Sequence, residues 1–172
     1  IIIIPVAVSV HTIVSWDFAM TLQPMWHSTI FGPYFVVGAI YSGIAMLLVT
    51  MYILRRGLGL QQYLSDAVFN NLSLLFIAMA LIWAYFTFAE HLTVFYGNEH
   101  AEMAVYNERI SGQFAPYFWT MIVLNIAVPV FVLAFRAGRK PLASTLVGIG
   151  VIIGMWLERY IIVVGTLSVP RL

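Results

Sequence analysis

His11 and Asp17 are two ionisable residues whose types and spacing suit proton chemistry. They lie six residues apart near the end of an apolar run over residues 1–16, which is about 9 Å along a helix. A carboxylate facing a polar pocket can accept a proton from a ligand, and an imidazole can pass one on. The structural alternatives are an aspartate in the headgroup layer and a histidine bonded to a neighbouring helix. The sequence leaves both interpretations open.

Glu158 and Arg159 form a second candidate, because they interrupt a long apolar stretch. Arg159 is about eight residues from the end of that stretch, hence about 12 Å deep. A charge in hydrocarbon costs at least about 2.5–3.5 kcal/mol, so an internal partner is expected. Adjacent helical residues point about 100° apart, so we expect each to meet a different partner. Asp17 is the predicted partner of Arg159; a purely structural tie between two helices is the alternative.

Glu90 and His91 follow an aromatic-rich stretch and open a polar segment that extends to Gln113. Glu90 is either a solvated residue at a helix end or a proton carrier, and the first is favoured. The other charged residues and the histidine of the segment are expected in a solvated loop: Glu99, His100, Glu102, Glu108 and Arg109. The spacing of its histidines and glutamates matches no compact metal-ligand pattern, so no metal site is predicted.

The sequence lacks the motifs of several other kinds of functional site. The chain has no cysteine, so it offers no disulfide and no thiolates for an iron–sulfur cluster. Haem in a helix bundle needs histidines deep in two helices, and only His11 comes close, so no intrinsic haem is expected. Phosphate-loop and hydrolase motifs are missing from the sequence. A net charge of +1 gives no reason to expect a nucleic-acid partner.

The composition predicts the elements that must position these residues. The chain is 62% hydrophobic and 9% charged, with a mean hydropathy of +0.96, whereas soluble domains carry about 25% charged residues. The surface must therefore face lipid. The sequence predicts an all-α membrane protein, a polytopic bundle of four to five transmembrane helices. The predicted spans cover residues 1–16, 33–54, 67–88, 116–135 and 142–167.

The start of the sequence bears on domain organisation. The chain opens with an isoleucine run at Ile1, without a basic segment before it, so this run is not a signal peptide. It is typical of a chain entered partway through a helix. We expect residues 1–172 to form a single transmembrane bundle, the later half of a longer subunit.

The loop charges predict the orientation in the membrane. The connectors after the second and fourth spans lie on one side and carry five basic residues: Arg55, Arg56, Arg136, Arg139 and Lys140. The opposite side carries Arg109 and Arg171. Because cytoplasmic loops are enriched in Lys and Arg, the first side is predicted to be cytoplasmic. Asp17, Glu90 and Arg159 then lie towards the external face.

Two long motifs resemble the NrfD-type quinol-interacting membrane subunits. The first is VHTIVSWDFA at residues 10–19, continued by WHSTIFGPYF at residues 26–35, and the second is GMWLERYIIV at residues 154–163. Within that superfamily the chain most resembles the ActC subunit of alternative complex III, a bacterial quinol:electron-acceptor oxidoreductase. The sister subunit ActF is similar in the first motif, and the Glu-Arg form of the second motif favours ActC.

The resemblance implies a fold and a set of partners. NrfD-like subunits have two four-helix bundles with flanking helices, and this chain matches the later half. They bind quinol, such as menaquinol, near the external face of the bacterial inner membrane. Electrons pass to an iron–sulfur peripheral subunit and on to c-type haem subunits, beside a sister NrfD-like membrane subunit.

The resemblance also implies roles for individual residues. The aspartate and the buried arginine of the family's quinol pocket fall on Asp17 and Arg159, with His11 beside them. A proton path through His11, Glu90 and Glu158 is implied as well. In this hypothesis Asp17 takes a proton from the quinol and Arg159 orients Asp17 or a quinone oxygen, while the chain holds no redox centre of its own. The alternative is an ActF-like protein that conducts protons or anchors partners without its own quinol site.

Overall fold

The computed structural model describes residues 3–21 and 28–168, in which every regular element is a helix. Three of the helical segments contain a short π-helical stretch (η) in which the turn widens. The elements are α1 (Ile3–Ser15) with η1 (Trp16–Met20), α2 (Phe31–Gly57), α3 (Asp66–Gly97), α4 (His100–Ile110), α5 (Ala115–Ile122) with η2 (Val123–Ala127) and α6 (Val128–Ala134), and α7 (Pro141–Tyr160) with η3 (Ile161–Gly165).

Five of the helical segments are long and apolar enough to cross a membrane. They are 3–20, 31–57, 66–97, 115–134 and 141–165, so the predicted polytopic all-α fold is confirmed. The third span is longer than expected, because α3 continues to Gly97 and ends where Asn98 adopts a left-handed conformation with φ of 48°. Such a residue terminates a helix by turning the chain out of the helical path. Residues 22–27, which lie between the first two predicted spans, are outside the described residues.

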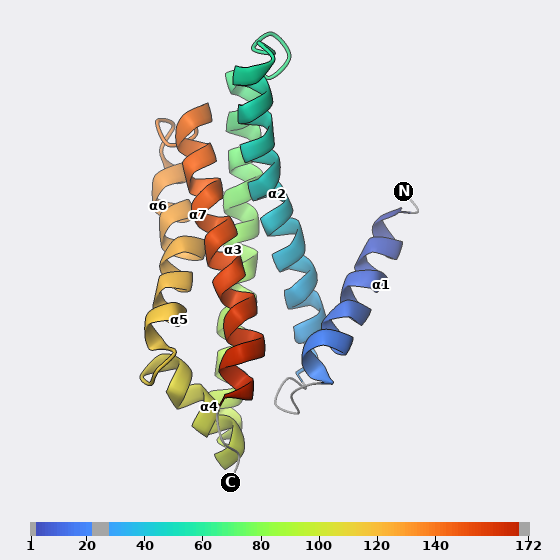
Figure 1. Ribbon diagram of the computed structural model, residues 1–172, viewed down its shortest axis with the longest axis vertical. Helices are drawn as coiled ribbons and strands as arrows, with labels where there is room; N and C mark the ends of the chain where they lie inside the picture. The colour runs from blue at the N-terminus through green and yellow to red at the C-terminus, as the bar shows by residue number, and fades with distance from the viewer. Residues whose placement is uncertain (1–2, 22–27, 169–172) are drawn as a thin grey trace.

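Four of these segments form a bundle (Figure 1), made of α2, α3, α7 and the continuous α5–η2–α6. Large side chains fill its interior at intervals of seven residues along α3: Phe69, Phe76 and Trp83, all 0% exposed. Tyr41 of α2 packs against them, with its ring 4.9 Å from that of Phe76. The helices α2 and α7 approach closely, since a Cβ at Gly148 would lie 3.1 Å from the Ala45 carbonyl oxygen. Small residues permit such approach in lipid.

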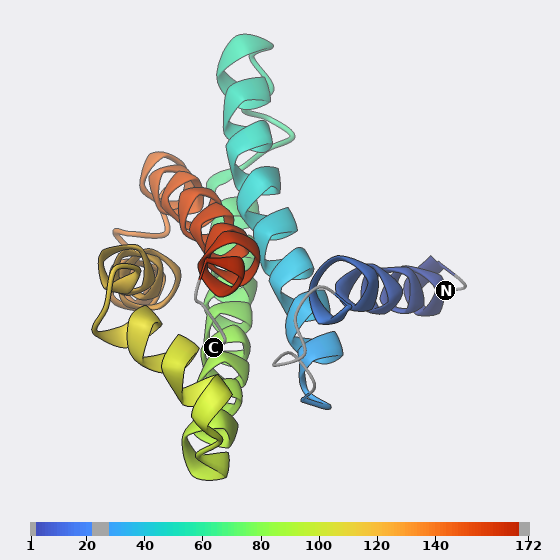
Figure 2. The same cartoon turned by 60° about the horizontal axis from the view of Figure 1, so that its bottom comes forward.

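The first helix diverges from this bundle. The C-terminal part of α1 meets the start of α2, where a Cβ at Gly32 would lie 3.1 Å from Cγ2 of Thr12. Towards its N-terminus α1 leans away from α2, as both views show (Figures 1 and 2). Residues of both helices line a groove between them.

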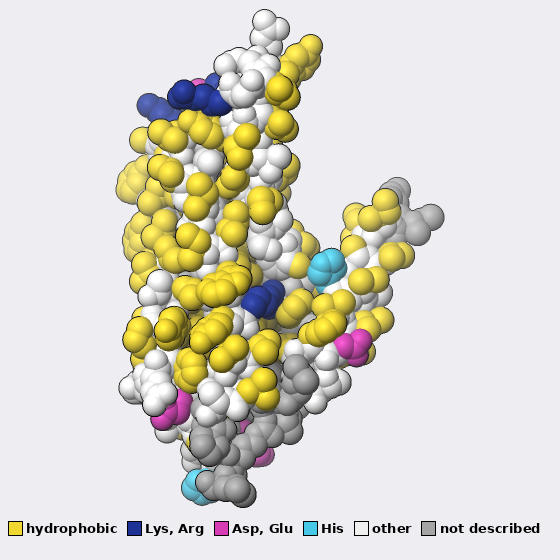
Figure 3. Space-filling view, viewed as in Figure 1, with side chains coloured by type: hydrophobic (Ala, Val, Ile, Leu, Met, Phe, Trp, Pro, Cys, Tyr) yellow, Lys and Arg dark blue, Asp and Glu magenta, His cyan; other side chains and the backbone are white. Residues whose placement is uncertain are grey.

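The two ends of the bundle differ in charge. Lys and Arg side chains gather at the end where α2 connects to α3 and α6 to α7 (Figure 3). There Arg55 forms an ion pair of 2.7 Å with Asp66. The other end is crossed by α4 (Figure 1).

The solvated loop predicted for this second end was wrong in its conformation and for two of its residues, while Glu99 and His100 are exposed as expected. Residues 100–110 form α4, and Glu102, Val105 and Arg109 are buried on one of its faces. These positions are three and four residues apart, so they point to the same side of the helix. That side packs onto the bundle, where α4 contacts α3 and α5.

Candidate functional site

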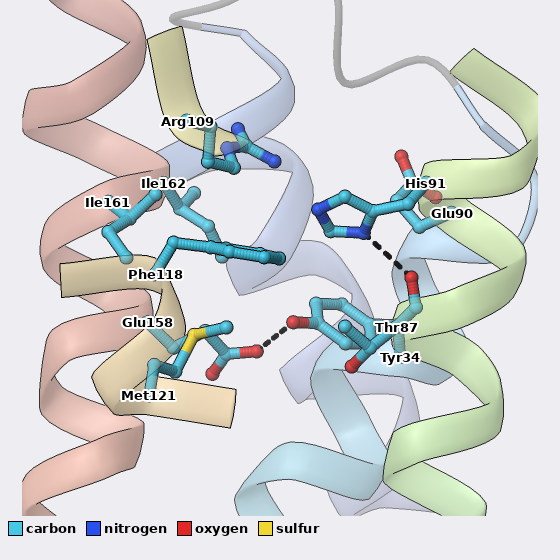
Figure 4. Close-up of a pocket in the computed structure, with 10 residues that line it drawn as sticks. All are labelled: Tyr34, Thr87, Glu90, His91, Arg109, Phe118, Met121, Glu158, Ile161 and Ile162. Atoms are coloured by element: carbon cyan, nitrogen blue, oxygen red, sulfur yellow. Dashed lines mark hydrogen bonds between the residues drawn. The ribbon is translucent and has the colours of Figure 1, made fainter. Parts of the chain in front are cut away.

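A small cavity lined by both polar and apolar residues lies inside the bundle near the end covered by α4. Its volume is about 20 Å³, and its polar lining comes from four helices (Figure 4). The polar lining residues are Tyr34 of α2, Thr87, Glu90 and His91 of α3, Arg109 of α4 and Glu158 of α7. Phe118 and Met121 of α5 complete one wall. Ionisable groups of four segments that are distant in sequence thus share one enclosed space.

Tyr34 and Glu158 are joined directly across this cavity. The phenolic O–H of Tyr34 donates a hydrogen bond to the Glu158 carboxylate, and both side chains are buried. The Tyr34 ring stacks on Trp83 with 6.0 Å between ring centroids. A buried carboxylate needs such a donor, because desolvation otherwise disfavours its charged form.

Glu90 is 3% exposed, so its prediction as a solvated residue was wrong. It accepts a hydrogen bond from the Ser28 hydroxyl. The reason is its place on α3, whose buried positions recur at alternating steps of four and three residues through Trp83, Thr87, Glu90 and Val94. That stripe was readable in the sequence and would have placed Glu90 inside, had the third span not been ended at residue 88.

His91 and Arg109 are cavity residues to which the sequence gave no site role. His91 Nδ1 lies 2.7 Å from the Thr87 carbonyl oxygen, which accepts the ring proton. Arg109 reaches the cavity from α4, and burial lowers the pKa of its guanidinium to about 10, against the raising effect of Tyr34 and Glu90. Among the described residues, no three His, Asp or Glu side chains are arranged to hold a metal ion.

Arg159 lies between the interior and the membrane-facing surface. Its Nη1 is 3.5 Å from Oε2 of Glu158, an ion pair that helical geometry argued against. Each residue also has a separate partner as expected, which is Tyr34 for Glu158 and Phe35 for Arg159. The arginine side chain is long enough to bend back towards the adjacent carboxylate. Its guanidinium carbon sits 3.8 Å from the centroid of the Phe35 ring, a cation–π contact. Its side chain is 31% exposed, and Gly38 makes room for it, since a Cβ there would lie 3.1 Å from Nη2.

A groove lies between α1 and α2, and Arg159 is not among its lining residues. Its volume is about 290 Å³, and its α1 wall includes His11 while its α2 wall includes Val36 and Ala39. These α2 residues neighbour Phe35 and Gly38, the two contacts of Arg159. Basic and histidine side chains are exposed in this angle of the molecule (Figure 3). His11 Nδ1 lies 2.8 Å from the Ala7 carbonyl oxygen.

Asp17 lies apart from the cavity residues. It is exposed on η1, and its backbone carbonyl accepts a hydrogen bond of 2.6 Å from Thr21. Among the described contacts, the carboxylate beside Arg159 is that of Glu158 rather than Asp17. Of the predicted residues, Glu90 and Glu158 line the cavity and His11 lines the groove. Arg159 contacts Glu158 and Phe35, and Asp17 lies apart from these residues.

The model of the family described as polysulphide reductase, NrfD, matches residues 1–170. The chain belongs to the NrfD family. The resemblance predicted from the two sequence motifs is thereby confirmed at the level of the family.

Two curated relatives narrow the context of this NrfD chain. The Hdr-like menaquinol oxidoreductase integral membrane subunit of Archaeoglobus fulgidus is 29% identical over 112 residues, 64% of this chain and 28% of the relative. A protein of Halobacterium salinarum, provisionally named as a dimethyl sulfoxide reductase membrane subunit, is 28% identical over 138 residues, 80% of this chain and 31% of the relative. The matched region therefore covers less than a third of the length of these relatives, both named as membrane subunits of oxidoreductases.

Proposed function

We propose that the chain is part of a quinol-binding and quinol-oxidising integral membrane subunit of an electron-transfer complex. The observation that carries the proposal is the position of Arg159, which is partly exposed and held between the Phe35 ring and the buried Glu158 carboxylate. Its contacts Phe35 and Gly38 on α2 are sequence neighbours of the groove residues Val36 and Ala39. A relative named as a menaquinol oxidoreductase subunit supports the same substrate class.

The groove suits an isoprenoid quinol. Its walls are mostly aliphatic, and it opens towards the face of the molecule that meets lipid, from which a quinol arrives. A quinol also needs polar partners for its ring oxygens, and a few polar groups in an apolar site fix ligand orientation. His11 supplies an imidazole at this groove, and Arg159 supplies a cation against residues that neighbour its α2 wall in sequence.

The residues of the interior cavity suit the uptake and transfer of the protons that the reaction releases. Oxidation of a quinol releases two electrons and two protons, so the site needs acceptors for both. The electrons leave to a redox centre on a partner subunit. Glu158, Tyr34 and Glu90 offer a path for protons away from the groove, because Glu158 adjoins Arg159 on one side and the cavity on the other.

The proposed type of subunit follows from the resemblance of the two sequence motifs. We propose an ActC-like subunit of alternative complex III in the bacterial inner membrane, with menaquinol or a related quinol as bound substrate. Its partners would be an iron–sulfur peripheral subunit, c-type haem subunits and a sister NrfD-like subunit. The five basic residues of the two basic connectors support a cytoplasmic position for that end, with Arg159 towards the external side and residues 1–172 as the later bundle of a longer subunit.

An ActF-like subunit, which conducts protons without a quinol site, is the second candidate. The buried Glu90 and Glu158 favour it, because carboxylates inside a membrane bundle mark proton relays. The two candidates differ in the role of the groove, so binding of quinone there separates them.

Arg159→Gln in the complete subunit, assembled in its complex, tests the proposal. We expect the affinity for a short-chain quinone analogue to fall by about tenfold or more, since a charge-assisted hydrogen bond is lost, and quinol oxidation to fall with it. Fluorescence or calorimetric titration of the purified complex measures the affinity. Arg136→Gln, at the opposite end of the bundle, is the matched control. Equal affinity in wild type and Arg159→Gln would contradict a quinol site at the groove.

Asp17→Asn tests the role of base that the resemblance implies for Asp17, which in the structure is exposed and lines neither the groove nor the cavity. An amide cannot accept the quinol proton, so we expect turnover of quinol oxidation to fall by about tenfold or more while quinone affinity changes little. Steady-state turnover of the assembled complex at saturating quinol is the measurement. Unchanged turnover would remove Asp17 from the mechanism and leave Glu158 as the nearest buried acceptor.

A further inference from the structure

His91 carries a ring nitrogen that the contacts described so far do not use. Its Nδ1–H donates to the Thr87 carbonyl oxygen at 2.7 Å, so Nε2 is the acceptor nitrogen of the neutral ring. Nε2 is buried and forms no hydrogen bond with any described residue. It points into the cavity, on the side where the Arg109 guanidinium approaches (Figure 4).

A second buried acceptor lies in the same cavity wall. Glu158 Oε1 accepts the Tyr34 hydroxyl, while Oε2 accepts no hydrogen bond within the described chain and has Nη1 of Arg159 at 3.5 Å. Two acceptors cannot bond each other, so each needs a donor, and a single water molecule can donate to both. The cavity volume of about 20 Å³ exceeds the 10–15 Å³ or so that one water needs.

We infer that the cavity binds one water molecule between His91 and Glu158, and that this water makes His91 a proton relay group. The water donates one hydrogen bond to His91 Nε2 and one to Glu158 Oε2, and its oxygen accepts from a donor in the cavity wall. Arg109 faces this position from α4. The water thus has the two to four polar partners that buried waters have.

The relay transfers one proton and involves no oxidation or reduction. The O–H bond of protonated Glu158 breaks as the water accepts its proton, and the water gives one of its own protons to Nε2 of His91. An imidazolium and a Glu158 carboxylate result. Glu90, which lines the same cavity and bonds to Ser28, receives the next proton. This step rests on the proposed quinol oxidation, which supplies the proton to Glu158.

Charged and titratable groups around His91 control how readily it takes the proton. Arg109 and Tyr106 face it from α4, Glu90 from α3, Tyr34 from α2 and Glu158 from α7. Arg109 opposes an imidazolium, while the two carboxylates favour it. The relay therefore predicts that the pH profile of turnover depends on His91.

His91→Gln in the complete, assembled complex tests the relay. Glutamine can accept a hydrogen bond from the water but cannot carry a second proton, so we expect turnover of quinol oxidation to fall by about tenfold or more with a changed pH profile and an unchanged quinone affinity. His100→Gln, at the start of α4, is the matched control and should leave turnover within twofold. Turnover of His91→Gln within twofold of wild type, with the same pH profile, would overturn the relay.

A cavity-forming variant separates proton transfer from a structural role. We expect His91→Ala to lose turnover and to regain part of it when imidazole is added, because a free imidazole can carry the proton in the space left by the side chain. An assembled His91→Ala complex without rescue contradicts the relay. If Arg159→Gln lowers quinone affinity while both His91 variants behave as wild type, the relay fails and the quinol site stands. A wild-type complex that binds no quinone removes both proposals.

Discussion

Replacement of Glu158 by glutamine is expected to lower quinol oxidation by about 100-fold or more. Glutamine keeps the volume and an acceptor oxygen for the Tyr34 hydroxyl, but it cannot take up a proton. General acid–base groups contribute about 10²- to 10⁴-fold to such reactions, and Glu158 is the buried carboxylate nearest Arg159. Turnover of the assembled complex, followed through reduction of its electron acceptor, is the measurement.

Glu99→Gln is the matched control for this substitution. Glu99 is exposed and lies just before α4, so its replacement should leave turnover unchanged. Assembly and quinone affinity of Glu158→Gln should stay close to wild type, which separates a proton role from a folding defect. A Glu158→Gln complex that turns over at the wild-type rate would show that protons leave the groove by another route.

Replacement of Gly154 by alanine is expected to destabilise the bundle by about 1–3 kcal/mol, as overpacking of a tight core does. A Cβ at this position would lie 2.2 Å from Oδ1 and 2.8 Å from Cγ of Asn125. The Asn125 amide cannot move freely, since its Nδ2 donates to Sδ of Met155 at 3.4 Å. Its backbone is also held, because its carbonyl accepts the Tyr41 hydroxyl at 2.8 Å.

Gly150→Ala on the same helix is the control. A Cβ there would meet Leu124 Cδ2 at 3.6 Å, which is ordinary contact, and alanine favours a helix over glycine by about 0.5–1 kcal/mol. We expect unchanged or slightly higher stability for this variant. Thermal unfolding of the two purified variants in detergent gives the comparison, and equal midpoints would contradict the tight contact at Asn125.

The burial of Glu90 and Arg109 marks the limit of sequence reasoning for this chain. Hydropathy averaged along the chain assigned both to solvent because polar residues surround them. The alternating four- and three-residue steps of α3 contained the signal for Glu90. Arg109 had no such signal in the sequence. Its burial depends on α4 packing across the end of the bundle against α3 and α5, and this contact forms only when the chain folds.

The ion pair between Arg159 and Glu158 is another contact that the sequence did not predict. Helical geometry alone separates adjacent side chains by about 100°, which argued against a pair with Glu158. Asp17 was the predicted partner because both residues are predicted to lie towards the same face of the membrane. The structure instead joins Arg159 to Glu158 at 3.5 Å, because the Phe35 ring and the space beside Gly38 fix where a long side chain can lie. Rotamer choice depends on those neighbours, and they come from another helix.

The sequence by itself determined that this protein is an all-α membrane bundle and a member of its family. Lipid accepts only chains whose backbone bonds are satisfied within each span, so composition and span length suffice for the first conclusion, and two long motifs suffice for the second. Only the tertiary structure decided which ionisable groups share a site. It brought Glu90, His91, Arg109 and Glu158 into one cavity and set Asp17 apart from it, because contacts between helices depend on packing angles and side-chain conformations that no local pattern encodes.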